Sequence, residues 1–131
     1  MKGFEVMPVL TDTIKAAWEN REGPAVLTTV DRNGNPNSIY VTCVLLYGDD
    51  SIAIADNYFN KTRDNICSGS RGSFLFITRE RKAFQIKGTI EYQKTGDIQE
   101  YLKNCLDAKY PVHAAAVLRV EEAYSGAERI I

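Results

Sequence analysis

The spacing of the short apolar runs between residues 25 and 93 restricts this chain to a small set of folds. Runs rich in β-branched residues lie at Ala25–Val30, Asn37–Tyr47, Ser51–Asp56, Gly72–Thr78 and Ala83–Gln93. Composition of this kind favours β-strands. Most connections between these runs are too short for the crossover helix that parallel strands require. The runs are therefore expected to pair as antiparallel strands.

Local turn signals agree with this arrangement. The Asn33-Gly34 pair between the first two runs is typical of a β-hairpin. Gly88 interrupts an otherwise β-like run, which predicts a bulge or a close approach of another backbone. A last strand is expected over Ala114–Ser125, which brings the total to six strands that a small barrel would leave without exposed edges.

Two segments at the ends of this array have helical periodicity. The first begins near Leu10, with Thr11 or Asp12 as its cap, and carries Trp18 on its apolar face. The second, "DIQEYLKNCLDAKY", runs from residue 97 to residue 110. We expect Asp97 and Glu100 to make a capping interaction there, and Cys105 to lie on the buried stripe.

Length and composition indicate one globular domain over residues 1–131, with 44% hydrophobic and 25% charged residues. The formal net charge of −1 offers no general attraction to nucleic acid or to an anionic membrane. The chain has three cysteines, Cys43, Cys67 and Cys105, which form neither a disulfide framework nor a zinc cluster and fit a reducing compartment. With no signal peptide or membrane span recognised, a cytoplasmic location is expected.

The segment "NYFNKTRDNICSG", residues 57–69, is the clearest candidate for chemistry. It places Lys61 and Thr62 at the expected first turn of a short helix, where free N–H groups, a cation and a hydroxyl would together attract a phosphate. Arg63 would add a second cation. In the simpler alternative, Thr62 caps the helix and the two basic side chains are solvated.

Two neighbouring strands favour the phosphate interpretation. Ala55 and Asp56 end the preceding run, and small or polar residues there let a flat ligand approach the backbone. The segment 38–42, "SIYVT", offers hydroxyls, backbone amides and one aromatic ring. A phosphate on the helix and a ring along two strand ends would describe a flat phosphorylated cofactor.

The arrangement of Lys61, Thr62, Asn65 and Ile66, preceded by a strand and followed by "SFLF", resembles the flavin mononucleotide (FMN)-binding split-barrel superfamily. This superfamily includes pyridoxamine 5′-phosphate oxidase and small flavin-binding proteins. The "IKGTIEY" strand around Gly88 also matches, and the resemblance extends from about residue 10 to about residue 120. It implies a mainly β fold: a six-stranded antiparallel split β-barrel with flanking helices.

The resemblance also implies a cofactor, FMN, held at the interface of a homodimer. Lys61 and Thr62 would hold its phosphate, and Gln85 is a candidate contribution from the second chain. The full set of cofactor-binding positions that the resemblance implies is Ser38, Ile39, Tyr40, Val41, Thr42, Ala55, Asp56, Lys61, Thr62 and Gln85. Val41 stands where small members of the group often have Asn, so a side-chain contact to the ring is replaced by backbone.

The function implied is that of an oxidoreductase or electron-transfer protein acting on a small molecule or a partner protein. The vitamin B6 oxidase itself is not expected, because its substrate-gripping Arg- and His-bearing segment has no match in "YSGAERII". The alternative is a non-enzymatic binding or sensing protein that uses haem or a deazaflavin. Haem would need His113, the only histidine, to face a pocket, whereas a deazaflavin tail would need further cations such as Arg63, Arg71 and Lys82.

Roles beyond cofactor binding stay open. His113 is either a structural residue or a proton-transfer group, and no residue is assigned to catalysis or to a metal. Tyr58 and Phe59 either cover the cofactor or contact a second chain.

Overall fold

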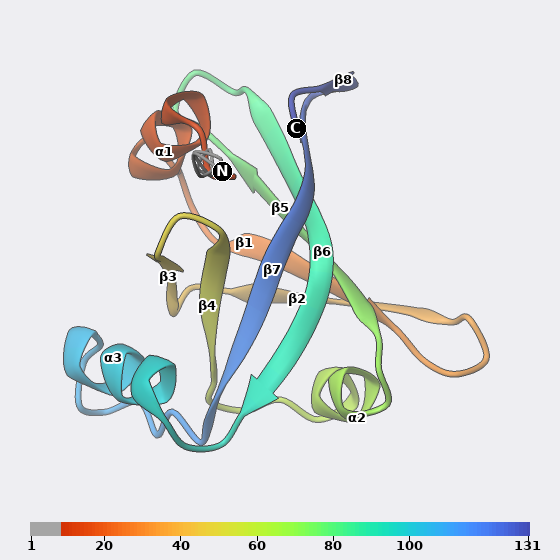
Figure 1. Cartoon of the computed structure of the whole chain (residues 1–131), viewed down its shortest axis with the longest axis vertical. Coiled ribbons are helices and arrows are strands. Elements are labelled where there is room, and N and C mark those ends of the chain that lie inside the picture. Colours follow the sequence, from red (N-terminus) through yellow and green to blue (C-terminus); the bar gives the residue numbers. More distant parts are fainter. Residues whose placement is uncertain (1–8) are drawn as a thin grey trace, which may run out of the picture.

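The computed structural model describes residues 9–131 as a curled antiparallel sheet with three helices (Figure 1). Short connections join each strand from β1 to β4 to the next, and the β1–β2 and β3–β4 pairs form antiparallel hairpins. The elements are α1 (Asp12–Glu19), β1 (Ala25–Val30), β2 (Pro36–Val41), β3 (Val44–Tyr47), β4 (Ser51–Asp56), α2 (Lys61–Cys67), β5 (Arg71–Ile77), β6 (Ala83–Gln93), α3 (Asp97–Cys105), β7 (Ala114–Ser125) and β8 (Glu128–Arg129).

The strands follow the order β2-β1-β5-β6-β7-β4-β3, and the two-residue β8 pairs with β7. Every pairing is antiparallel, which confirms the expected mainly β split barrel with flanking helices. The expected number of strands was too low, because the run 37–47 is two strands and not one. The chain leaves β2 after Val41 and enters β3 at Val44, so the two parts pair with β1 and β4 at opposite ends of the sheet.

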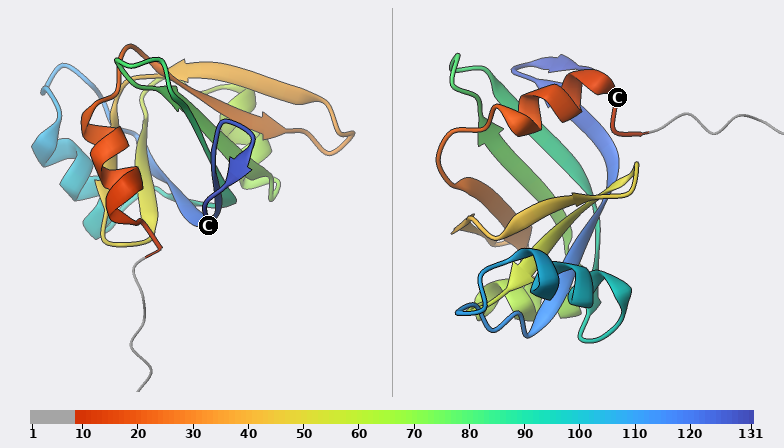
Figure 2. Two further views of the ribbon diagram at one scale, coloured as in Figure 1. Left: turned by 90° about the horizontal axis from the view of Figure 1, so that it is seen from above. Right: turned by 90° about the vertical axis from the view of Figure 1, so that its left-hand side faces the viewer.

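Strands β4 and β7 are covered on both faces. Ile52 and Ile54 of β4 pack into the main core, which α1 also enters with Trp18. Ala53 and Ala55 face the other way, into a second cluster with Ile98 and Leu102 of α3 and Val117 of β7, among others. The double coverage explains why β4 lacks the alternation typical of a strand with one solvated face (Figure 2).

Gly88 lies at the register shift between β6 and β7, as its position in the sequence predicted. A Cβ atom at this position would overlap the backbone carbonyl of Arg119 on β7. The close approach therefore requires glycine, and the irregular register bends the longest strand pair of the sheet.

The helix ends only partly follow the sequence-based expectations. Thr11 caps α1 by accepting from the backbone N–H of Ile14, as predicted. The expected cap of α3 is wrong, because the helix begins at Asp97, after Gly96, and has no side-chain cap. It also ends at Cys105 and not at residue 110, since Leu106 is extended and Asp107 starts a turn by accepting from the N–H of Lys109. Cys105 is exposed, contrary to the expectation, because the helix turns its buried face elsewhere.

None of the helices within residues 9–131 has both the length and the apolar character that crossing a membrane would demand.

Candidate functional site

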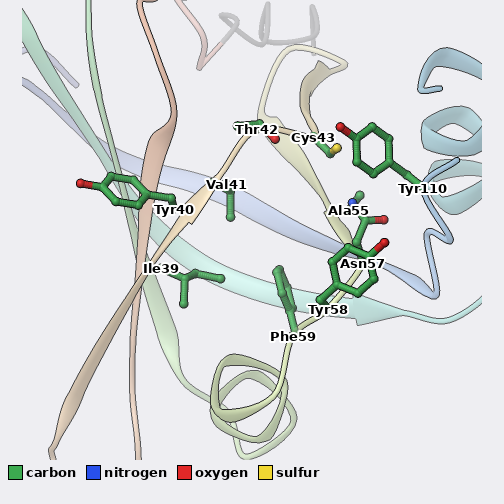
Figure 3. Close-up of a pocket in the computed structure, with 10 residues that line it drawn as sticks. All are labelled: Ile39, Tyr40, Val41, Thr42, Cys43, Ala55, Asn57, Tyr58, Phe59 and Tyr110. Carbon is green, nitrogen blue, oxygen red and sulfur yellow. The ribbon is translucent and has the colours of Figure 1, made fainter.

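A pocket of about 300 Å³ opens between the end of β2 and the end of β4 (Figure 3). Its walls are formed by the end of β2 with the β2–β3 junction, by the end of β4 with the β4–α2 connection, and by the loop before β7. Its lining residues are Ile39, Tyr40, Val41, Thr42, Cys43, Ala55, Asn57, Tyr58, Phe59 and Tyr110. The wall is apolar and aromatic, with a few uncharged polar groups, as in many sites for flat organic ligands.

Five consecutive residues, 39–43, line this pocket. Side chains alternate between the two faces of a strand, so a pocket on one face would be lined by every second residue. A consecutive run instead places the pocket along the backbone edge. Among residues 9–131, β2 pairs with β1 alone, and no strand of this part of the chain neighbours its other edge. Backbone N–H and C=O groups on that edge are available to a ligand.

The predicted cofactor positions divide between this pocket and its surroundings. Ile39, Tyr40, Val41, Thr42 and Ala55 line it. The other predicted positions (Ser38, Asp56, Lys61, Thr62 and Gln85) do not.

Asp56, at the end of β4, is fully buried and committed to the protein. Its carboxylate accepts two hydrogen bonds from Arg63, with Nε at 2.7 Å and Nη2 at 3.1 Å, one from the Tyr92 hydroxyl at 2.5 Å, and one from the Phe59 N–H at 3.0 Å. Its side chain therefore fastens β4 to α2 and β6. Each of its two carboxylate oxygens accepts two hydrogen bonds from the protein, so the side chain needs no ligand to satisfy it.

These contacts shift the ionisation of the whole cluster. Burial opposes the charge on Asp56, but the hydrogen bonds from Arg63, Tyr92 and Phe59 outweigh it, and the pKa of the carboxyl is lowered. The hydrogen bond to Asp56 is the main cause that raises the pKa of Arg63. Burial, followed by the hydrogen bond to Asp56, raises the pKa of Tyr92 to about 12. The cluster is thus an ion pair with a neutral phenol at neutral pH.

Lys61 and Thr62 differ in their availability. Lys61 is exposed at the start of α2 and forms no ion pair within residues 9–131. Thr62 is buried, and its hydroxyl oxygen accepts a hydrogen bond of 3.1 Å from the side-chain amide of Asn37 on β2. It does not cap α2, whose N-cap residue is Asn60, so the simpler alternative for Thr62 is wrong. Lys61 and Asn37 line a second hollow of about 400 Å³.

Ser38 and Gln85 lie on the outer face of the sheet. Ser38 exchanges a hydrogen bond of 2.7 Å with Thr28, and Gln85 donates to Ser73 at 3.0 Å. The strand registers place side chains from five strands in two rows across this face. The first row is Tyr40, Val26, Leu75, Gln85 and Tyr124, and the second is Ser38, Thr28, Ser73, Lys87 and Glu122. We call these ten residues the outer face.

Exposure on this outer face is unusual for apolar side chains. Tyr40 is 78% exposed and Leu75 is 41% exposed, whereas most large apolar residues between positions 9 and 131 are buried or partly buried. Tyr40 also lines the pocket, so the pocket and the outer face meet at this residue.

Three lining residues with polar side chains were not among the expected cofactor positions: Cys43, Asn57 and Tyr110. Asn57 is the first residue after β4, and Tyr110 comes from a loop more than fifty residues later. No sequence pattern connects them, since the contact depends on how the segment after α3 returns to the sheet. His113 and Cys67, which were considered from the sequence, are exposed and do not line this pocket.

The loop that carries Tyr110 is held against the β4–α2 connection. The backbone N–H of Val112 donates to Oδ1 of Asn57 at 3.0 Å, and the N–H of His113 donates to the carbonyl oxygen of Asp56 at 2.9 Å. Val112 has a φ of 43°, in the left-handed region that a β-branched residue rarely adopts. Such a conformation costs about 1–3 kcal/mol and persists only where surrounding contacts enforce it.

The chain matches a family model described as "Pyridoxamine 5'-phosphate oxidase" over residues 10–130. An uncharacterised protein of Methanocaldococcus jannaschii is 26% identical over 121 residues, which cover 88% of this chain and 80% of that protein.

Solved structures share the fold. HupZ of Group A Streptococcus is 28% identical, with a TM-score of 0.76 over 88% of this chain and 92% of that one. An FMN-binding protein from Syntrophomonas wolfei is 21% identical, with a TM-score of 0.68 over 83% of this chain and 80% of that one.

Proposed function

The chain belongs to the pyridoxamine 5′-phosphate oxidase family, and from this premise we propose that it is an FMN-binding flavoprotein that takes part in oxidoreduction. The observation that carries the proposal is the free backbone edge of β2 along the pocket. The pyrimidine side of an isoalloxazine ring presents alternating donors and acceptors, which a strand edge complements. The FMN-binding protein of Syntrophomonas wolfei, which has the same fold, supports the choice of cofactor.

The ring would lie against Ile39, Val41 and Ala55, with Tyr58 and Phe59 covering it from the α2 side. Phe59 is partly buried against the main core, whereas Tyr58 is 78% exposed. The chain's own contribution is to orient the ring, hydrogen-bond its edge and exclude water from one side. When bound, FMN supplies the hydride or one-electron chemistry.

The phosphate would lie at Lys61. Asn37 and Val41 are on the same face of β2 and four residues apart, which corresponds to about 13 Å along a strand. Asn37 lines the hollow beside Lys61, and Val41 lines the pocket. A ribityl chain running along β2 would therefore join a ring at one end to a phosphate at the other. Thr62 would support this end through its bond to Asn37.

The alternative cofactors find less support at these residues. Haem would need an axial ligand, but the His113 side chain is exposed and lies outside the pocket lining. The longer phosphorylated tail of a deazaflavin would need further cations. Arg63 is paired with Asp56, and Arg71 is paired with Glu121 at 2.6 Å. Lys82 lines neither the pocket nor the hollow beside Lys61.

We also propose that the protein works as a homodimer through its outer face. This face presents Tyr40 and Leu75 to solvent beside polar partners, and such a mixture of aromatic, aliphatic and uncharged polar groups is typical of interfaces. Because Tyr40 belongs to both the outer face and the pocket, a second chain seated there would complete the cofactor site. Gln85 is the residue that it would contribute.

The first test is the visible spectrum of the protein purified without added cofactor, with mass spectrometry of the compound that heating releases. We expect flavin absorption and FMN. A Soret band, or a colourless protein that ignores added FMN, would overturn the proposal.

The second test separates the phosphate from the ring. Lys61→Ala is expected to weaken FMN binding by about tenfold to a hundredfold, the range of a lost charge-assisted hydrogen bond. Binding of lumiflavin, which has the ring and no phosphate, should not change. Lys94→Ala, a substitution of another exposed lysine, is the matched control. Equal FMN affinity in the Lys61 and Lys94 variants would contradict the phosphate assignment.

A further inference from the structure

Asn57 is a buried polar residue in the wall of the pocket. It follows β4 directly, and only 9% of its surface is exposed. It contributes to the lining beside Ala55 and Tyr58 (Figure 3). Neither the family resemblance nor the cofactor positions inferred from it give this residue a role.

The orientation of its amide is fixed by chemistry. The backbone N–H of Val112 lies 3.0 Å from the Asn57 side chain, and a backbone N–H can only donate. Oδ1 must therefore face Val112. The nitrogen Nδ2 then points away from Val112. Within residues 9–131 it has no hydrogen-bond partner on the protein, and it is not among the buried atoms left unsatisfied, so it is open to the pocket.

The acceptor side of this arrangement is rigidly supported. Val112, whose N–H donates to Asn57, has a φ of 43°. The carbonyl oxygen of the same residue accepts a hydrogen bond of 2.9 Å from Nε2 of Gln99 on α3. Both polar groups of Val112 are thus engaged, one by α3 and one by the pocket wall. A strained residue held on both sides next to a ligand pocket is typical of a preorganised site.

We propose that Asn57 is a specificity-determining residue that donates a hydrogen bond from Nδ2 to an acceptor atom on the ring of the bound ligand. The acceptor would be a carbonyl oxygen or an unprotonated nitrogen on a flat, uncharged heterocycle. This inference rests on the proposed function, since the isoalloxazine edge is such a heterocycle. It adds a side-chain donor of fixed direction to the backbone groups of β2.

Asn57→Asp tests the direction of this hydrogen bond with little change of shape. One carboxylate oxygen still accepts from Val112, while the other replaces the donor with an acceptor. The new carboxylate would be largely buried next to Asp56, so we expect a lower melting temperature. The folded variant should bind both FMN and lumiflavin about tenfold to a hundredfold more weakly. The absorption maximum of the bound ring should also shift. Asn104→Asp, the same change at an exposed position of α3, is the control and should bind both flavins normally.

The outcomes distinguish this inference from the proposed function. Lys61→Ala should weaken the binding of FMN alone, whereas Asn57→Asp should weaken the binding of FMN and of lumiflavin equally. If the unaltered protein binds both flavins and Asn57→Asp binds them as tightly, the inference is overturned and the cofactor assignment stands. If the unaltered protein binds neither, both fall.

A second measurement covers the case in which the variant does not fold. The side-chain NH₂ signals of Asn57, assigned in the unaltered protein through its own Cβ, are followed by ¹H–¹⁵N NMR during titration with lumiflavin. We expect them to shift far more than those of Asn104. Equal small shifts of the two would refute the hydrogen bond.

Discussion

Replacing Asp56 by Asn is the sharpest test of how the site is held together. The carboxylate accepts four hydrogen bonds, and through them it joins the end of β4 to Arg63 of α2 and Tyr92 of β6. Asn has nearly the same shape but no charge, and its NH₂ group would face donors. The substitution therefore removes the ion pair without opening a cavity.

The expected loss of stability is about 2–4 kcal/mol. Breaking a fully buried ion pair typically costs about 3–5 kcal/mol. The Arg63 side chain is 37% exposed, so water can compensate part of the loss, which lowers the estimate. For 131 residues the entropy of unfolding is about 0.28 kcal/mol/K, so a loss of about 3 kcal/mol lowers the melting temperature by roughly 10 °C.

The pH dependence follows from the lowered pKa of Asp56. Because the pKa of this carboxyl is lower in the folded state than its unfolded value of about 3.9, its stabilisation is complete above that value. It is lost as the pH falls below about 3.9 and through the folded pKa. The difference between the unaltered protein and Asp56→Asn should therefore be full at neutral pH and shrink in strongly acidic solution.

Urea unfolding followed by circular dichroism measures this difference at each pH. Glu121→Gln is the control, because it breaks an ion pair with Arg71 whose side chains are 54% and 46% exposed. That loss should stay below about 1 kcal/mol. If Asp56→Asn costs no more than Glu121→Gln, or if its effect does not depend on pH, the role assigned to the buried cluster is refuted.

Two further substitutions test the fold and the assembly. Gly88→Ala should destabilise the protein by about 3 kcal/mol or more, because the new Cβ would meet the backbone of Arg119. Gly72→Ala meets side chains, chiefly that of Ile90, and no backbone, so it should cost less in the same urea experiment. Leu75→Lys should convert a dimer into a monomer in light scattering, while Tyr101→Lys, at 39% exposure on α3, should not; a protein whose mass is unchanged by Leu75→Lys does not dimerise through the outer face.

The strands were predictable because their signals are local. Periodicity and turn residues such as Asn33, Gly34 and Gly88 identify a meander without knowledge of distant contacts. The break at Thr42 was not predictable, since both halves of the run 37–47 are equally β-like. What separates them is that one half pairs with β1 and the other with β4, a long-range choice that no local pattern records.

The site was predictable to the extent that it follows the backbone. The resemblance identified the β2 segment, and five of the ten expected positions line the pocket. It could not show that Asp56 is used internally, because the partners Arg63 and Tyr92 come from other elements. Nor could it reveal Asn57, whose direction depends on the backbone of Val112.

Side-chain alternation along β2 and β6 explains why Ser38 and Gln85, which were expected at the cofactor, lie on the outer face and not in the pocket. Ser38 and Tyr40 point to the outer face, where Gln85 also lies, while Ile39 and Val41 point to the inner face, on which Asn37 of β2 meets Thr62 of α2. Side chains on opposite faces of one strand contact the same flat ligand only if the ligand lies along the strand edge. Within one chain, β1 and β5 lie between β2 and the strand β6 that carries Gln85. A role for Gln85 in the site is therefore compatible with this sheet only if it comes from a second chain, so the role proposed for Gln85 depends on the dimer proposal, whereas the ring contacts along β2 do not.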